Sequence, residues 1–419
     1  MDSLEALSRG FFEICNELCE DVDAHHWNVY RPSARRRKER AEMRFVCSLC
    51  QKEYPVDTRE FRCSCGGPFD LAWTPGGLSV SSLRDREPTL WRYREWIPVL
   101  EDDCIVSLRE GFTPLIRHSY KGFRRLFLKL DYLCPTGSYK DRGASVLVSK
   151  LKELGIRRCV ADSSGNAGAA IAAYAARAKI ECTVYCPAHT SEGKLVQIRA
   201  YGANLVKVPG TRADTAKAVQ EETRRLYYAS HNWNPFFLAG MKTLAFELGE
   251  QMGWQVPDAA VCPVGYGGIY LGLYMGFKEL LNQGILKKMP RLIGVQSEAV
   301  SPLYQAFSRE AIDVAPVPSR ETLAEGIACV HPIRGRKILE IARETGGTFE
   351  IVSEEEILDG WRSLAQEGIY VEPTSAVVIK AIDGLEKKGL LNHDETIVLI
   401  LTGIGLKATD TLGQYLRAA

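Results

Sequence analysis

The sequence predicts an α/β protein built from two doubly wound lobes, with a small cysteine-bearing segment ahead of them. Short apolar runs of strand type alternate with helical stretches over most of the chain, a pattern typical of parallel βαβ units. Several of these runs end in glycine- or serine-containing turns that open the next helix. The length of 419 residues is enough for two or more domains, since one domain usually takes roughly 100 to 200 residues.

Residues 1–44 are predicted to form a helical and basic extension. Residues 1–30 carry scattered acidic side chains and no continuous apolar core, which is unlike a secretory signal. The basic run Arg31–Arg44 is interpreted as a solvated linker, with a nucleic-acid patch as the alternative. A net charge of +1 favours neither nucleic acid nor acidic lipid, and no stretch approaches the roughly 18 apolar residues of a membrane span. We therefore expect a cytoplasmic protein without nucleic-acid or membrane partners.

Residues 45–73 are predicted to form a zinc-ribbon-like segment. Thirteen cysteines without regular spacing argue for reduced thiols, but four of them form two close pairs. The pairs are Cys47 with Cys50 and Cys63 with Cys65. Gly66 and Gly67 allow the tight turn that brings four sulfurs to one tetrahedral point, and a closed site of this kind is structural. Because the second pair has a single intervening residue, four bystander thiols are the alternative.

Residues 126–235 are predicted to form the smaller lobe, a compact parallel βαβ unit. Its strands are expected at 126–133, 157–161, 182–186 and 205–208, and its helices at 166–178, 193–201 and 213–227. Residues 74–125 and 236–419 are assigned to the larger lobe. Its helices are expected at 243–252, 270–281 and 355–366, and its strands at 259–264, 292–295, 349–352 and 396–401. Open α/β sheets bind ligands at the carboxyl ends of their strands.

Three turns at such strand ends carry candidate chemistry. Lys140 lies in Pro135–Gly143, which opens a helix, and a lysine at such a turn is a candidate Schiff-base lysine rather than a solvated cation. Ser163–Gly168 precedes an alanine-rich helix whose N-terminus offers free N–H groups to an anion. The glycines of Gly265–Gly268 let backbone amides close on a phosphate, and Thr402 ends an apolar strand. Ordinary turns and strand caps are the alternative interpretation.

These turns belong to five segments that occur in the order seen in fold-type II pyridoxal phosphate (PLP) enzymes. The segments are Glu110–Leu115, Pro135–Gly143, Ser163–Gly168, Gly265–Gly268 and Leu401–Lys407. The chain most closely resembles the threonine synthase group, from about Cys47 to Lys407. The resemblance implies a tryptophan synthase β-like fold with the cofactor between the lobes, a structural zinc in the cysteine segment and a homodimer.

The resemblance also implies roles for single residues. Lys140 would bind PLP and move the substrate's Cα proton, Asn166 would contact the 3-hydroxyl of the cofactor, and Thr402 would face its pyridine nitrogen. The phosphate of PLP would lie on Gly265, Tyr266, Gly267, Gly268 and Ile269. The substrate would lie on Ser163, Ser164, Gly165, Asn166, Ala167 and Phe237.

The chain departs from the family pattern where a substrate phosphate would bind. Phe237 stands where related synthases carry an arginine. The family's threonine, histidine and asparagine are replaced at Ala167, Ile404 and Tyr266. Candidates to compensate are Arg142, His231 and Lys242.

The predicted activity is elimination and water addition on an activated amino acid such as O-phosphohomoserine, giving threonine. The alternative is a PLP-dependent β-eliminase or β-replacement enzyme, of the serine/threonine ammonia-lyase, diaminopropionate ammonia-lyase or cysteate/cysteine synthase type. Either reaction implies a small-molecule amino-acid substrate. A non-catalytic zinc-ribbon binding module is a further alternative, and the intact Lys140, Asn166 and Thr402 argue against it.

Overall fold

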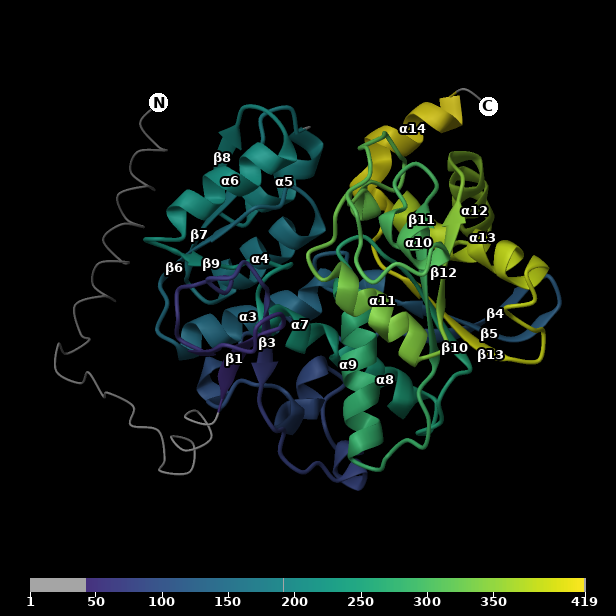
Figure 1. Ribbon diagram of the computed structural model, residues 1–419, viewed down its shortest axis with the longest axis horizontal. Helices are drawn as coiled ribbons and strands as arrows, with labels where there is room; N and C mark the ends of the chain where they lie inside the picture. Colours follow the sequence, from purple (N-terminus) through teal and green to yellow (C-terminus); the bar gives the residue numbers. More distant parts are fainter. Residues whose placement is uncertain (1–42, 191, 418–419) are drawn as a thin grey trace, which may run out of the picture. The chain divides into compact units, whose positions relative to one another are not determined.

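The computed structural model describes residues 43–190 and 192–417. The predicted extension over residues 1–44 therefore lies almost wholly outside the described residues. The described chain forms three sheets, and the two larger ones lie in separate halves of Figure 1 with helices around them. This mixed α/β architecture confirms the predicted fold class.

The cysteine-bearing segment is a three-stranded antiparallel sheet in the order β2-β1-β3. Its strands are β1 (Arg44–Cys47), β2 (Glu53–Pro55) and β3 (Phe69–Ala72), and the short 3-10 helices η1 (Val80–Leu83), η2 (Leu90–Trp96) and η3 (Asp102–Cys104) follow. Phe45 stacks on Phe69 with ring centroids 5.5 Å apart, and it meets Phe236 of a later helix at 5.3 Å. Aromatic packing therefore anchors this sheet to the rest of the chain.

The smaller lobe is built on a four-stranded parallel sheet in the order β8-β7-β6-β9. Its strands are β6 (Arg158–Ala161), β7 (Glu181–Pro187), β8 (Asn204–Val208) and β9 (Tyr227–Tyr228). Its helices are α3 (Lys140–Glu153), α4 (Asn166–Arg177), α5 (Glu192–Ala200) and α6 (Arg212–Glu222). The alanine-rich α4 is buried and contacts both α3 and β7, because its small side chains let neighbouring elements approach closely.

The larger lobe is built on a six-stranded sheet in the order β12-β11-β10-β13-β5-β4, parallel except for β4. Its strands are β4 (Leu115–Tyr120), β5 (Phe123–Leu130), β10 (Ala259–Pro263), β11 (Arg291–Ser297), β12 (Thr348–Val352) and β13 (Thr396–Leu401). Its helices are α7 (Pro235–Met241), α8 (Thr243–Gln251), α9 (Gly268–Asn282), α10 (Pro302–Ser308), α11 (Gly335–Glu344), α12 (Glu354–Gln366), α13 (Pro373–Lys387) and α14 (Thr409–Arg417), with 3-10 turns η4 (Asp131–Leu133), η5 (Glu325–Ile327) and η6 (Gly405–Ala408). Strands β10 and β13 are buried along their whole length, as expected for parallel strands covered on both faces.

Two expectations about the elements were wrong. The predicted lobe boundary at residue 126 falls inside β5, which pairs with β13 in the larger sheet, so the smaller lobe begins later in the chain. Helix α6 ends at Glu222 and not at residue 227, because Tyr227–Tyr228 form β9 and pair with β6. The other domain boundaries stay predictions.

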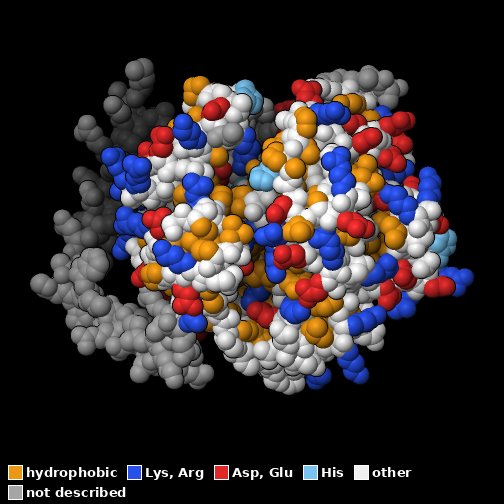
Figure 2. Space-filling model, in the orientation of Figure 1, with side chains coloured by type: hydrophobic (Ala, Val, Ile, Leu, Met, Phe, Trp, Pro, Cys, Tyr) orange, Lys and Arg blue, Asp and Glu red, His pale blue; other side chains and the backbone are white. Residues whose placement is uncertain are grey.

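The surface carries charges of both signs. Figure 2 shows acidic and basic side chains interspersed over the visible face, in keeping with the net charge of +1. Among the described residues, no helix combines the length and the apolar composition that crossing a membrane requires.

Candidate active site

A cavity of about 470 Å³ lies at the carboxyl ends of strands from both lobes, within the usual size range of small-molecule sites. The loops after β6, β10 and β13 line it, together with the first residues of α3 and α6. The predicted site residues that line it are Lys140, Ser163, Ser164, Gly165, Asn166, Ala167, Gly265, Tyr266, Gly267, Gly268, Ile269 and Thr402. The structure therefore brings together every predicted cofactor and substrate residue except Phe237.

Backbone pairing holds the Lys140 turn against the end of β13. Ser138 bridges Gly403, and the Tyr139 N–H donates to the Thr402 carbonyl at 3.0 Å. The Ile404 N–H donates in turn to the carbonyl of Gly137, whose φ of +80° lies in the region that favours glycine. This pairing places the start of α3, which carries Lys140, beside Thr402, although the two residues are far apart in sequence.

Lys140 is the first residue of α3 and lines the cavity. Its Nζ donates to the Tyr139 hydroxyl at 2.7 Å. Burial lowers the pKa of the amine from its usual value of 10.5 to about 8, with the carboxylate of Glu372 opposing the shift and the charge of Arg212 adding to it. The neutral form that a nucleophile or general base requires is therefore reached at a lower pH than for an ordinary lysine.

The Ser163–Gly168 turn presents the N-terminus of α4 to the cavity. An added Cβ at Gly168 would lie 1.8 Å from the Ser163 carbonyl oxygen, so this close backbone approach requires glycine. The Asn166 side-chain amide donates to both oxygens of Glu372, at 3.0 and 3.1 Å. Burial raises the pKa of Glu372, while Asn166 and the nearby lysine charges act in the opposite direction. The loop can thus present backbone donors to a carboxylate while Glu372 fixes its asparagine.

The Gly265–Gly268 turn presents the N-terminus of α9. Gly267 has a φ of +85°, and an added Cβ at Gly265 would lie 2.9 Å from the Ile327 Cα. An added Cβ at Gly268 would meet nothing within 4 Å, so open space lies beside the first turn of the helix. Free N–H groups at this end of a helix suit a phosphate.

Thr402 supplies a buried hydroxyl on the cavity wall. Its Oγ1 lies 2.8 Å from the hydroxyl oxygen of Ser375, and that same oxygen accepts the Thr402 and Gly403 N–H groups at 2.8 Å each. Ser375 thereby fixes the turn that carries Thr402. The residues present fit PLP: an amine for its aldehyde, a helix N-terminus for its phosphate and a hydroxyl for its ring nitrogen.

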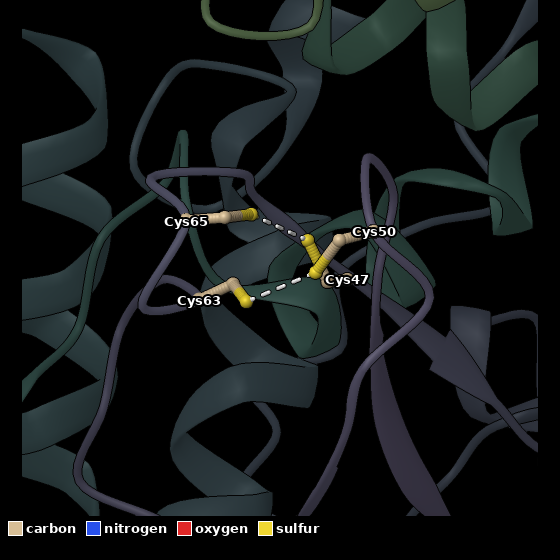
Figure 3. A group of neighbouring side chains, drawn as sticks. All are labelled: Cys47, Cys50, Cys63 and Cys65. Atoms are coloured by element: carbon tan, nitrogen blue, oxygen red, sulfur yellow. Dashed lines mark hydrogen bonds between the residues drawn. The ribbon is translucent and has the colours of Figure 1, made fainter.

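The four predicted zinc ligands form one cluster at the tips of the small sheet (Figure 3). Their sulfur atoms all lie within 4.8 Å of one another, with Cys47–Cys65 and Cys50–Cys63 separations of 3.5 Å. A zinc ion with bonds near 2.3 Å requires sulfurs about 3.8 Å apart, so the cluster needs little adjustment. The Tyr54 hydroxyl donates to the Cys63 sulfur at 3.3 Å, an interaction that stabilises a thiolate.

Phe237 lies behind the cavity and does not line it. Its side chain is fully buried, its ring centroid is 6.0 Å from the Lys140 Nζ, and an added Cβ at Gly143 would meet it at 2.5 Å. The prediction that Arg142, His231 and Lys242 replace the missing phosphate ligands was wrong for two of the three residues. Lys242 pairs with Glu279 at 2.6 Å and Arg142 is fully buried, so neither lines the cavity, whereas His231 does.

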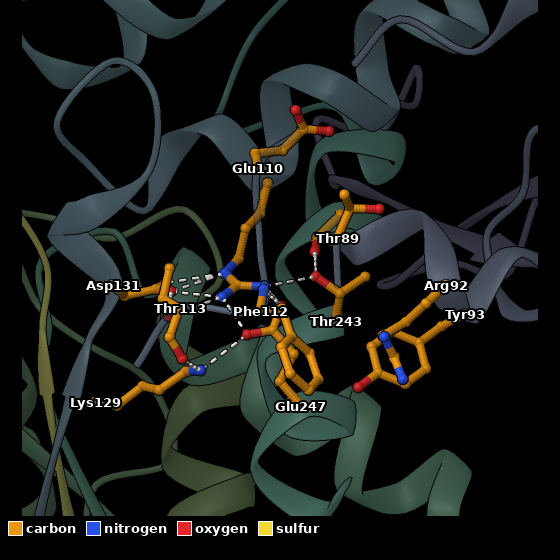
Figure 4. Close-up of polar contacts among 12 residues, drawn as sticks. Thr89, Arg92, Tyr93, Glu110, Phe112, Thr113, Lys129, Asp131, Thr243 and Glu247 are labelled. Atoms are coloured by element: carbon orange, nitrogen blue, oxygen red, sulfur yellow. Dashed lines mark hydrogen bonds and ion pairs between the residues drawn. The ribbon is translucent and has the colours of Figure 1, made fainter. Parts of the chain in front are cut away.

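Arg142 belongs to a fully buried group of four charges, and Figure 4 labels the other three members, Lys129, Asp131 and Glu247. Arg142 pairs with Asp131 at 2.5 Å and with Glu247, while the Lys129 Nζ lies 2.9 Å from Glu247. Burial works against the charge of Glu247, but Arg142 and Lys129 hold its pKa at about 2. The charges of two cations and two carboxylates cancel here. Because Arg142 lies on α3 and both of its partners lie in the larger lobe, the cluster fastens α3 to that lobe.

Sequence reasoning gave no role to four charged residues that line the cavity, namely Arg212, Glu325, Glu372 and Lys407. For Glu372 a signal existed, because Glu372-Pro-Thr-Ser375 matches a segment near the cofactor in the resembled family. Arg212 gave no such signal. It is the first residue of a helix with few apolar positions, and sequence periodicity does not say where such a side chain points.

Comparison with known proteins agrees with this geometry. The family model described as "Pyridoxal-phosphate dependent enzyme" matches residues 106–403. Threonine synthase of Methanocaldococcus jannaschii is 39% identical over 375 residues, which cover 87% of this chain and 93% of that protein. Threonine synthase of Methanosarcina acetivorans is 36% identical over 376 residues, covering 87% and 92%.

Solved structures show the same fold. Maize serine racemase superposes with a TM-score of 0.61 at 22% identity, covering 73% of this chain and 92% of that one. A threonine deaminase from T.th. superposes with a TM-score of 0.55 at 29% identity, covering 67% and 87%. The family model, the synthase relatives and the fold agree. The chain therefore belongs to the fold-type II family of pyridoxal-phosphate-dependent enzymes, and the relatives named above are threonine synthases.

Proposed function

We propose that this protein is a PLP-dependent lyase of threonine synthase type, acting on an activated amino acid such as O-phosphohomoserine. The observation that carries the proposal is one cavity in which the Lys140 amine faces the N-termini of both α4 and α9. One helix N-terminus can take a substrate carboxylate while the other takes a cofactor phosphate. The proposed reaction is inferred from the relatives that are threonine synthases.

When bound, PLP supplies an electron sink for the negative charge that forms at the substrate's Cα. Lys140 is the group that moves the Cα proton, because its amine lies in the cavity with a pKa of about 8. The backbone donors of Ser163–Ala167 orient the carboxylate. Thr402 offers a neutral hydroxyl to the ring nitrogen, which does not force protonation there and suits elimination more than transamination.

The overall conversion takes O-phosphohomoserine and water to threonine and inorganic phosphate. The phosphate leaves Cγ, and water adds at Cβ. The chain must therefore bind a dianion at the far end of the substrate, and a dianion away from water requires cationic or strongly donating partners. Cationic side chains that line the cavity besides Lys140 are Arg212 and Lys407.

A β-eliminase or β-replacement enzyme is the second candidate. It is favoured by the lack of an arginine at Phe237, the position where the resembled synthases carry one. The non-catalytic alternative is not carried forward, because the chain belongs to an enzyme family and keeps Lys140, Asn166 and Thr402.

The two candidates separate in one assay. Purified protein with PLP is incubated with O-phosphohomoserine, O-phosphoserine, serine, threonine or diaminopropionate, and threonine, phosphate, ammonia and keto acid are measured. We expect threonine and phosphate in equal amounts from O-phosphohomoserine. Ammonia and keto acid from serine, threonine or diaminopropionate, without threonine from O-phosphohomoserine, would establish the eliminase instead.

We further propose a structural zinc ion on the four clustered cysteines, a cytoplasmic location and a homodimeric state. The sulfur cluster supports the metal, and the described cysteines are all free thiols, as in a reducing compartment. Dimerisation rests on the family resemblance. Light scattering during gel filtration measures the oligomeric mass directly, and fractionation of the native cell locates the protein.

A further inference from the structure

We propose that Arg212 binds the anionic group at the far end of the substrate's side chain and so determines the preference for a phosphorylated substrate. The inference rests on the proposed function and deepens it, since it names the specificity-determining residue of the same cavity. It also explains how the chain can do without the arginine that related synthases place at the position of Phe237.

The position of Arg212 is fixed by the start of α6. Gly210 has a φ of +100°, and Thr211 caps the helix through a reciprocal pair of hydrogen bonds with Asp214. Arg212 is therefore the first helical residue, at the end of the loop that follows β8. Its side chain is 41% exposed and lines the cavity.

The other positive groups of the cavity are committed to other partners. Lys140 is the cofactor lysine, and Lys407 lies in the electrostatic field of two carboxylates, Glu372 and Asp141. His231 is held neutral, because burial and the charges of Lys140 and Arg212 keep its pKa well below the usual range. The carboxylates that face this part of the cavity are Glu372, which Asn166 holds, and Glu325.

Arg212 itself is only loosely paired. Its Nη2 lies 3.7 Å from Asp162, beyond hydrogen-bond length, and its other neighbours are the hydroxyls of Tyr266 and Tyr228. A guanidinium has five donors in a planar fork, so donors remain for a phosphate, which it binds in a bidentate manner. Tyr266 belongs to the Gly265–Gly268 turn, so it links Arg212 to the proposed cofactor end of the cavity.

Arg212 is also close enough to act on the reacting groups. Its charge lowers the pKa of both Lys140 and His231, which places the guanidinium within electrostatic reach of the amine. The substrate's α-carboxylate is assigned to the α4 N-terminus, and the cofactor's phosphate to the Gly265–Gly268 turn. The anion left for Arg212 to bind is therefore the phosphate at the far end of the substrate.

The test compares two ligands that differ in the distal anion alone, with the cofactor-loaded enzyme. 2-Amino-5-phosphonopentanoate carries a phosphonate in place of the substrate's phosphate, and norvaline has the same carbon chain without it. Calorimetry measures both dissociation constants for the wild type, Arg212→Gln, Arg212→Lys and Arg199→Gln. Arg199 is a matched control, because it lies on α5 in a surface ion pair with Glu192 and does not line the cavity.

We expect Arg212→Gln to weaken phosphonate binding about tenfold to a hundredfold, the usual value of a charge-assisted pair, with norvaline binding unchanged. Arg212→Lys should recover part of the loss, and Arg199→Gln should bind both ligands as the wild type does. A wild-type preference for the phosphonate that survives in Arg212→Gln overturns the role of Arg212 and leaves the proposed function standing. If the wild type itself shows no preference for the phosphonate, the phosphorylated substrate is wrong, and this inference falls with it.

Discussion

The Lys140 amine lies among groups supplied by three different loops. Tyr139 accepts its hydrogen bond, Glu372 contributes a negative charge, and Arg212 contributes a positive one. Burial has the largest effect on the amine, and the two charges act in opposite directions on it. Single substitutions at these neighbours should therefore move the protonation of Lys140 in a predictable direction.

Replacing Lys140 with alanine should leave a folded protein that forms no covalent bond to PLP and does not turn over. Borohydride reduction of the wild-type holoenzyme, followed by peptide mapping, should label Lys140 and no other lysine. The exposed Lys121, which pairs with Asp383, is the control, and Lys121→Ala should keep both the label and the activity. A label on another lysine would show that the assignment is wrong.

Capture of PLP by the cofactor-free protein should become faster as pH rises, with an apparent pKa of about 8. The neutral amine is the reactive form, and it becomes dominant above the lowered pKa. Because the Glu372 carboxylate raises this pKa, Glu372→Gln should move the midpoint to lower pH. Stopped-flow absorbance between about pH 6 and 11 gives both profiles. A midpoint that stays near 10.5 would mean that burial does not act on Lys140 in this way.

At the scale of elements, the site depends on turns that are joined across long sequence distances. The α3 turn, the end of β13 and the start of α13 form a continuous backbone ladder, since Glu372 also donates its N–H to the Gly403 carbonyl at 2.9 Å. Ser375, on α13, accepts two of the N–H groups of this ladder. One buried hydroxyl thus joins α13 to the end of β13, the middle segment of this ladder.

Ser375→Ala should destabilise the protein and weaken PLP binding. The change leaves the buried N–H groups of Thr402 and Gly403 without a partner, and each unsatisfied buried donor costs roughly 1 to 3 kcal/mol. Urea unfolding measures the stability, and titration with PLP measures the affinity. Ser82→Ala, which removes two hydrogen bonds at an exposed site, should change neither by more than a few tenths of a kcal/mol. Equal effects of the two substitutions would refute the role of Ser375.

The cysteine cluster should bind about one zinc ion per chain, and Cys47→Ser should lose it. Because metal binding and folding are coupled in such segments, the loss should expose residues 45–73 to amide exchange more than the walls of the cavity. Elemental analysis and hydrogen exchange are the measurements. Cys104→Ser, outside the cluster, should retain the zinc. A wild-type protein prepared in reductant without chelator that contains no metal would rule out this site.

For the whole molecule, a buried charge network connects the lobes. Arg142 on α3 meets Asp131 after β5 and Glu247 on α8, so the helix that carries Lys140 is fixed to the larger lobe through ion pairs without any exposed surface. A complete network of this kind stabilises the fold little more than well-packed apolar side chains would. Removing one member lowers the stability strongly, because the remaining buried charges lose their partner in a medium of low polarity.

Arg142→Met should lower the unfolding free energy by about 3 to 5 kcal/mol, since two buried carboxylates then share Lys129 alone. Chemical unfolding is the measurement. Arg94→Met breaks a more exposed pair with Asp102 and should cost no more than about 1 kcal/mol. If the two variants prove equally stable, the network does not fasten α3 as described.

The sequence by itself determined the fold class, most strands and helices, and the positions of the turns at Lys140, Asn166, Gly265–Gly268 and Thr402. These features are local: hydrophobic period, turn-forming residues and the order of motifs are all written along the chain. Only the tertiary structure decided which side chains share the cavity. Phe237 was expected in it and lies behind it, whereas Arg212 lines it without any sequence signal. Whether a side chain on a short helix points toward a cavity or into the core depends on how distant elements pack around it, and no local pattern records that.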